Sequence, residues 1–202
     1  MNETGRYTGL SLFGLALASA VICSCAKPLP KDSLRVEPRP FFPDGGKNTT
    51  DHQLTAGGRL AVKYQGSGRL IRITVWNCHQ GSKTKIWGAG TTKADFRGEV
   101  SIMLRDVLKN SQANAYEMSL TGLLKGTFRI PKPPDETGFS APLELPGTIV
   151  IAAGEGTAIW GYGKYVVGAD GKAELRTEGE TIDELAKKAS WAVIVTLELE
   201  GK

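Results

Sequence analysis

Apolar and polar residues alternate over several short stretches of this chain, which is the pattern of strands in a sheet with one buried face. Residues 60–64 place Leu60, Val62 and Tyr64 on one side, and residues 69–76 place Ile71, Ile73 and Val75 on one side. Residues 148–153 form an unbroken apolar run, typical of a strand that is covered on both faces. The chain is therefore predicted to be all-β.

Two parts of the chain resemble each other. Ile86-Trp87-Gly88-Ala89-Gly90 matches Ile159-Trp160-Gly161-Tyr162-Gly163, and further along Tyr116 matches Trp191. We interpret residues 70–126 and 143–201 as two tandem repeats of four strands each. Four strands alone cannot bury both faces, so the repeats are predicted to form an eight- to nine-stranded sandwich or a flattened barrel. Trp87 and Trp160 are predicted to pack between the sheets, with their rings over strand glycines.

One short helix is expected within the second repeat. Thr181-Ile182-Asp183-Glu184 reads as a capping box, and the following apolar residues share one helical face, which predicts a helix over residues 181–190. Val100 to Leu104 fits helical as well as strand spacing. The repeat favours a strand over residues 99–105.

The N-terminus has the pattern of an export signal over residues 1–25. Arg6 precedes an uncharged apolar run from Leu10 to Cys25 that is too short to cross a bilayer comfortably and matches a signal-peptide core. The run ends Ile22-Cys23-Ser24-Cys25, which resembles the lipobox of bacterial lipoproteins. The resemblance implies that Cys25 is acylated and that the protein is anchored to a membrane of the cell envelope. Ordinary cleavage near Ala20 or Ala26, or an uncleaved anchor, are the alternatives.

A proline-rich segment follows the signal. Five of the ten prolines fall within residues 28–43, and such a segment favours extended, polyproline-like backbone. Residues 26–50 are therefore predicted to be a tether that precedes a folded domain over residues 51–202. The alternative is an arm packed on the domain, in which Leu34-Arg35-Val36 adds an edge strand.

Composition and charge restrict the class of protein. With 202 residues, 41% hydrophobic and 23% charged, the chain is long enough for one globular core. The net charge of +4 is unchanged when residues 1–25 are removed, and the basic residues are scattered singly between apolar positions. This pattern indicates a solvated strand face, and a nucleic-acid partner is not expected.

Candidate chemistry is sparse. Cys78 and His79 are adjacent and occur in only one repeat; together with His52 they could hold a metal ion or form a nucleophile and base. Neighbouring residues on a strand point to opposite faces, which argues against their acting together. No catalytic motif or cofactor fingerprint is found, so no catalytic residue, metal or cofactor is assigned. Trp76, Tyr162 and Lys164 are the candidate ligand-binding residues.

These observations favour an exported, lipid-anchored envelope protein whose β-domain is a non-catalytic interaction or binding module. Its partners would be the membrane, through the lipid anchor, and an envelope protein or glycan. One alternative is a glycan or small-ligand binder that uses exposed aromatic side chains. The other is a metal- or thiol-dependent envelope hydrolase centred on Cys78, His79 and His52.

Overall fold

The computed structural model describes residues 28–41, 54–107, 115–133, 138–167 and 179–201. Within these ranges the chain forms eleven strands and one helix: β1 (Ser33–Arg39), β2 (Leu54–Gln65), β3 (Leu70–His79), β4 (Ser82–Thr92), β5 (Phe96–Asp106), β6 (Ala115–Gly122), β7 (Gly126–Pro131), β8 (Gly138–Glu144), β9 (Ile149–Ala152), β10 (Gly156–Val166), α1 (Ile182–Lys188) and β11 (Trp191–Leu199).

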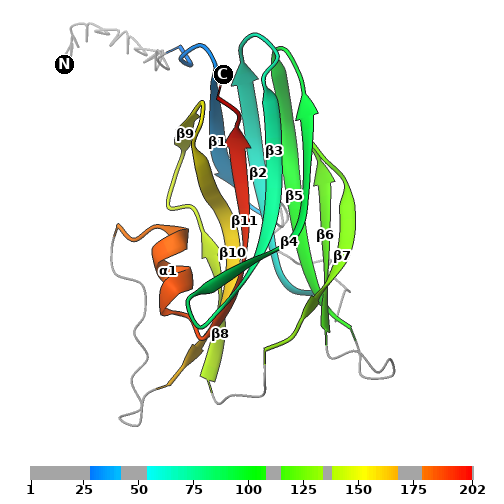
Figure 1. Cartoon of the computed structure of the whole chain (residues 1–202), viewed down its shortest axis with the longest axis vertical. Helices are drawn as coiled ribbons and strands as arrows, with labels where there is room; N and C mark the ends of the chain where they lie inside the picture. The colour runs from blue at the N-terminus through cyan, green and yellow to red at the C-terminus, as the bar shows by residue number, and fades with distance from the viewer. Residues whose placement is uncertain (1–27, 42–53, 108–114, 134–137, 168–178, 202) are drawn as a thin grey trace, which may run out of the picture.

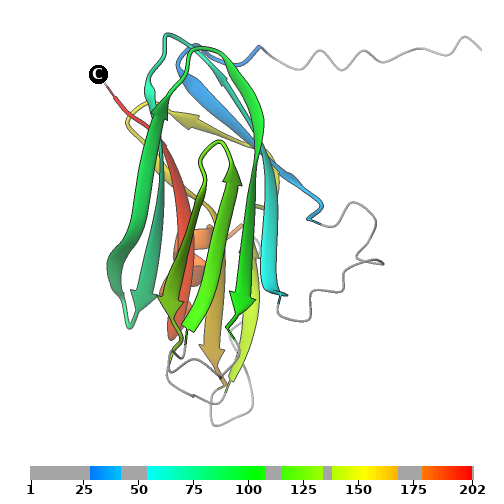
Figure 2. The same ribbon diagram turned by 90° about the vertical axis from the view of Figure 1, so that its right-hand side faces the viewer.

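The strands form two antiparallel sheets that pack face to face (Figure 1, Figure 2). The six-stranded sheet has the order β7-β6-β5-β2-β1-β9 and the five-stranded sheet the order β4-β3-β11-β10-β8. Both sheets end in edge strands, so the predicted all-β sandwich is confirmed and the flattened barrel is not. The described strands number eleven rather than eight or nine, because β1, β7 and β8 lie in proline-containing segments that the sequence pattern did not assign as strands.

The main core lies between the two sheets and follows the alternation seen in the sequence. Ile71, Ile73 and Val75 of β3 have no exposed surface, and Val100 of β5 is equally buried on the facing sheet. The strand predicted over residues 99–105 is thus confirmed, because its apolar residues fill this core at every second position.

Strand β1 corrects the prediction of a tether over residues 26–50. It lies inside the six-stranded sheet, where seven of its residues pair with β2 and four with β9. Leu34 and Val36 are completely buried, and Leu29 is only 9% exposed. This part of the proline-rich segment therefore belongs to the sandwich, and as an interior strand rather than the edge strand of the alternative. Residues 1–27, including Cys25, and residues 42–53 lie outside the described ranges.

Asp32 fixes the start of β1 to the turn between β2 and β3. Its backbone has a φ of 54°, a conformation that Asp and Asn tolerate better than most residues. Its carboxylate accepts hydrogen bonds from the Ser67 amide at 3.1 Å and the Tyr64 hydroxyl at 3.0 Å, and pairs with Arg69 at 3.4 Å. These contacts, the Ser67 amide foremost, lower the pKa of Asp32 from 3.8 to about 2.

Replacing Asp32 with Asn is expected to make stability less sensitive to acid. A carboxyl group with a lowered pKa stabilises the fold above its unfolded pKa, and this contribution is lost as the pH falls through its folded value. The wild type should therefore be more stable than Asp32→Asn at neutral pH, and the difference should close as the pH falls towards about 2. Urea unfolding of both proteins from neutral pH down to about 2 measures this difference in stability. A constant difference at all pH values would contradict the assignment.

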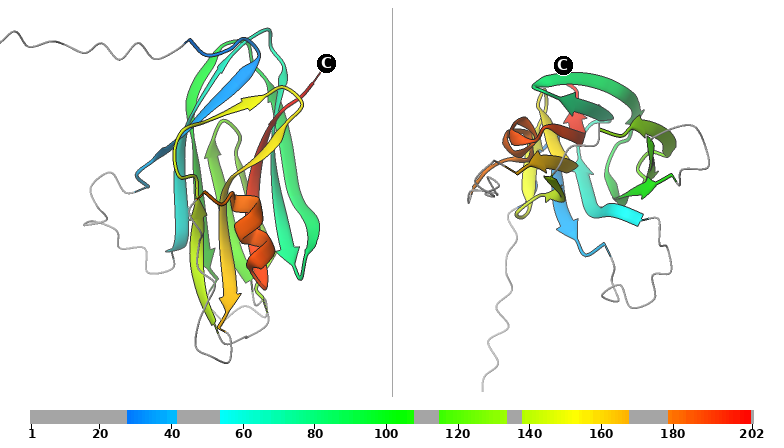
Figure 3. Two further views of the ribbon diagram at one scale, coloured as in Figure 1. Left: turned by 90° about the vertical axis from the view of Figure 1, so that its left-hand side faces the viewer. Right: turned by 90° about the horizontal axis from the view of Figure 1, so that it is seen from below.

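Helix α1 covers the outer face of the five-stranded sheet (Figure 3) and confirms the predicted helix. Both halves of the capping box are present: the Glu184 amide donates to the Thr181 hydroxyl, and the Glu184 carboxylate accepts from the Thr181 amide. Ile182 and Leu185 are buried in a second apolar cluster with Ile194 of β11. In the described part of the chain, no helix has the length and apolar character needed to cross a bilayer.

The two predicted repeats do not share one strand arrangement. In the first repeat β3 and β4 form a hairpin within one sheet, whereas their counterparts β9 and β10 lie in different sheets. Tyr116 and Trp191, the predicted equivalents, instead touch each other across the core, with ring centroids 5.7 Å apart. The prediction of one four-strand unit written twice is therefore wrong for these strands, whose pairing differs between the two segments. The predicted return strand at residues 173–176 lies outside the described ranges.

The two repeated tryptophans do pack over glycines between the sheets, as predicted. The Trp160 ring lies where a side chain on Gly58 of β2 would project, and the Trp87 ring lies 2.9 Å from such a position on Gly126 of β7. Trp87 also stacks on Phe128 at 5.4 Å between centroids. Both positions are packing sites, but Trp160 is 1% exposed whereas Trp87 is only half-buried.

Candidate functional site

A pocket of about 180 Å³ lies between helix α1 and the β3–β4 hairpin. The hairpin turns at Gln80 and Gly81, which both have positive φ, so the two-residue turn is of type I′. Lys83 of β4 forms an ion pair with Asp183 of α1 at 3.3 Å, which joins the hairpin to the helix at the pocket. The strand side of the pocket contains Cys78 and His79.

Cys78 and His79 occupy opposite faces of β3, as their adjacency predicted. Cys78 packs with the apolar cluster under α1, whereas His79 is paired in register with Trp191, which belongs to the core between the sheets. Burial raises the pKa of the Cys78 thiol, so the thiol stays protonated at neutral pH. The thiolate is the form that attacks substrates and binds metals.

The structure does not assemble a metal site around these residues. The described residues contain no group of three His, Cys, Asp or Glu side chains that could hold a metal ion. His52, the third ligand considered from the sequence, lies outside the described ranges. The imidazole Nδ1 of His79 is buried without a hydrogen-bond partner, and the structure offers no explanation for it.

The three predicted ligand-binding residues are not brought together. Tyr162 is 8% exposed and lies in the core, edge-on to Tyr116 at 6.2 Å, so the expectation that it is an exposed aromatic is wrong. Trp76 lies half-buried on the opposite face of the sheet, where its indole N–H donates to the Thr196 hydroxyl at 3.0 Å and Lys83 covers its ring. Lys164 of β10 is half-buried. The sheet itself separates Trp76 from Tyr162.

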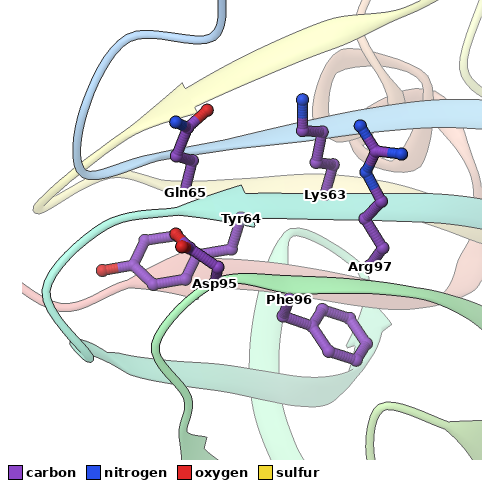
Figure 4. A pocket seen from close by; sticks show the side chains of 6 residues that line it. All are labelled: Lys63, Tyr64, Gln65, Asp95, Phe96 and Arg97. Carbon is purple, nitrogen blue, oxygen red and sulfur yellow. The ribbon is translucent and has the colours of Figure 1, made fainter.

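The outer face of the six-stranded sheet carries three basic side chains in a row across neighbouring strands. Arg35 of β1 lies directly opposite Lys63 of β2, and Lys63 lies directly opposite Arg97 of β5. These three residues, called the cation row below, point away from the core. Figure 4 shows Lys63 and Arg97 projecting on the same side of the sheet, with the ring of Phe96 on the other. Two hollows of about 430 and 370 Å³ flank Lys63 and Arg97.

The cation row has no carboxylate partner among the described residues. Three acidic residues lie two positions from the row along the chain. Asp95 lines the same hollow as Lys63 and Arg97 and accepts from the Gly66 amide at 3.1 Å, whereas Glu37 and Glu99 each pair with an arginine on the far side from the row. Glu99 accepts from Arg59 at 2.6 Å, and Glu37 accepts from Arg39 at 3.1 Å. Like charges directly opposite each other destabilise a sheet, so a bound anion would relieve this repulsion.

The cation row could not be seen in the scattered basic residues of the sequence. Arg35, Lys63 and Arg97 are separated by about thirty residues each and meet only through strand register, which the local pattern does not specify. The available signal was alternation itself: Arg35 and Lys63 each sit between two core positions, and Arg97 follows Phe96, which packs against the core. Comparisons with protein-family models, curated proteins and solved structures found no match.

Proposed function

We propose that this protein is an exported, lipid-anchored component of a bacterial cell envelope, and that its β-sandwich is a non-catalytic binding module. The anchor rests on the lipobox-like residues that end at Cys25. The observation that carries the binding role is the cation row, because three cations without a carboxylate partner among the described residues lie on three neighbouring strands and form a surface suited to an anionic partner.

The path of the chain supports an anchored arrangement. Leu29 packs into the end of the sandwich, only four residues after Cys25. Four extended residues reach at most about 14 Å. An acyl group on Cys25 would therefore hold the domain close to the bilayer, rather than at the end of a long tether.

The alternatives from other classes have weaker support. A thiol-dependent hydrolase would need a reactive Cys78, but burial raises the pKa of this thiol. The thiol also lies on the opposite face of β3 from His79, so His79 cannot act as its base. A ligand site built on exposed aromatic residues would need Tyr162 at the surface, and that side chain lies in the core.

Replacing Cys25 with Ser is expected to abolish acylation and release the protein from the membrane fraction, because serine has no thiol to receive the lipid. Cells that express each form are labelled with a fatty acid, and the soluble and membrane fractions are compared. Cys23→Ser is the matched control: it removes the neighbouring thiol and should leave labelling and membrane association unchanged. Membrane association that persists in Cys25→Ser without acylation would show an uncleaved anchor instead.

A further inference from the structure

The cation row lies at the end of the sandwich that the N-terminal segment enters. Arg35 is two residues beyond the start of β1, Lys63 is two residues before the end of β2, and Arg97 is the second residue of β5. Strands rise about 3.3 Å per residue, so all three lie within about 7 Å of this end. The chain enters β1 here through the buried Leu29 (Figure 1).

The cation row has no carboxylate partner among the described residues, and other basic residues surround it. The same face also carries four arginines outside the row, Arg39, Arg59, Arg105 and Arg129, and three carboxylates, Glu37, Glu99 and Glu117. Arg39 pairs with Glu37, and Arg59 pairs with Glu99. Seven basic and three acidic side chains on these strands leave the face with a net positive charge, and the row contributes three of the cations. Lys31 precedes β1 at the same end and is exposed, with no carboxylate partner among the described residues.

We propose that the cation row binds the phosphate groups of anionic phospholipids in the membrane that holds the anchor. This inference rests on the proposed lipid anchor, and it identifies the partner of the binding face. The anchor confines the row to within a few tens of ångströms of the headgroups, which raises their effective concentration. A basic surface beside an anionic membrane adds an electrostatic attraction to the attachment that the anchor supplies.

The anchor geometry favours a membrane over a soluble anion as the partner. Basic residues near an anionic membrane surface each contribute about 1 kcal/mol, and this attraction fades within a Debye length of about 8 Å. An anchor of this length allows the row to touch the headgroups, and in that docked orientation the row lies inside this range. Three such residues correspond to an approximately hundredfold preference for the docked orientation on anionic over neutral membranes.

The test uses the full chain purified from the membrane fraction of expressing cells. The protein is reconstituted into vesicles of phosphatidylcholine alone, or of phosphatidylcholine with phosphatidylglycerol. A water-soluble amine-acylating reagent is applied briefly, and mass spectrometry quantifies the modification of each lysine. Lys63 should be modified at least about tenfold more slowly in the anionic vesicles. Lys187, exposed on α1, should be modified equally in both.

Two variants decide whether the row is responsible. Arg35→Gln/Arg97→Gln keeps Lys63 as the reporter, and in this variant the anionic vesicles should no longer protect Lys63 from the reagent. Lys85→Gln/Lys125→Gln removes the same amount of charge from two exposed positions outside the row. In this variant the anionic vesicles should still protect Lys63. Equal labelling of wild-type Lys63 in both vesicles, or equal loss of protection in both variants, would overturn the proposal.

Two further measurements distinguish free phosphate from membrane phosphate and test the anchor separately from the row. Protection of Lys63 by glycerol phosphate in neutral vesicles, as strong as that by phosphatidylglycerol, would assign the row to a free phosphate and overturn the membrane assignment. Flotation with neutral vesicles reports the anchor alone. A chain that floats with neutral vesicles but shows no protected Lys63 keeps its anchor and refutes the row, whereas protection without flotation supports the row and refutes the anchor.

Discussion

Replacing Trp160 with Ala is expected to destabilise the domain by about 3–5 kcal/mol, the cost of removing a buried aromatic side chain without refilling its space. The ring is 1% exposed and fills the space above Gly58 of the facing sheet. Glycine cannot close the cavity, because it has no side chain to move inward. Urea unfolding followed by circular dichroism measures the change in free energy.

Trp87→Ala is the matched control, because the sequence repeat pairs these two residues. Trp87 belongs to the edge strand β4, is half-buried and stacks on Phe128, so its loss should cost only about 1–2 kcal/mol. Trp160→Phe should also cost less than Trp160→Ala, since it keeps most of the ring and removes an indole N–H that has no hydrogen-bond partner. If Trp87→Ala and Trp160→Ala lowered the free energy of unfolding equally, the two tryptophans would be equivalent, as the sequence repeat predicts.

Replacing Leu34 with Ala is expected to cost about 2–5 kcal/mol, as for other fully buried leucines. Leu34 is completely buried and belongs to β1, which is paired on both sides. A residue in a solvated tether would give no measurable change. The same unfolding experiment therefore measures whether this segment is part of the domain.

Val150→Ala serves as the control for Leu34. Val150 belongs to the neighbouring strand β9 and is 53% exposed, so its truncation should change stability by no more than about 0.5 kcal/mol. If Leu34→Ala behaves like Val150→Ala, β1 does not contribute to the folded core.

Local patterns in the sequence predicted the elements whose fold depends on near neighbours. The alternation at Leu60, Val62 and Tyr64 identified β2, and the capping box at Thr181 and Glu184 identified α1. Each signal lies within a few residues of the element it describes, so no tertiary contact was needed to interpret it.

Strand β1 was predicted only as an alternative to a tether, and then as an edge strand, because prolines dominate its surroundings. Proline removes a ladder donor and is tolerated in a sheet where one side of the strand is open. Strand β9 pairs only with Ser33 to Val36, so within the described ranges no strand flanks β1 on that side at Pro38. The sequence shows the prolines, but the length of the neighbouring strand is a property of the assembled sheet.

The repeat was misleading for a related reason. Similar residues around Trp87 and Trp160 reflect similar local packing over glycine, and this likeness does not determine which strands pair. The cation row depends on register between β1, β2 and β5, and thus on contacts between residues far apart in the chain.

The interior position of β1 determines how the domain would respond to a mechanical load. A pull on a lipidated Cys25 would be transmitted through Leu29 into β1, along the direction of the strand. The hydrogen bonds to β2 and β9 run perpendicular to an antiparallel strand, so both ladders would be sheared together rather than opened one bond at a time. Forced unfolding is governed by the rate at which such contacts rupture. A lipid anchor on Cys25 would thus be attached to a part of the fold where many bonds share the force.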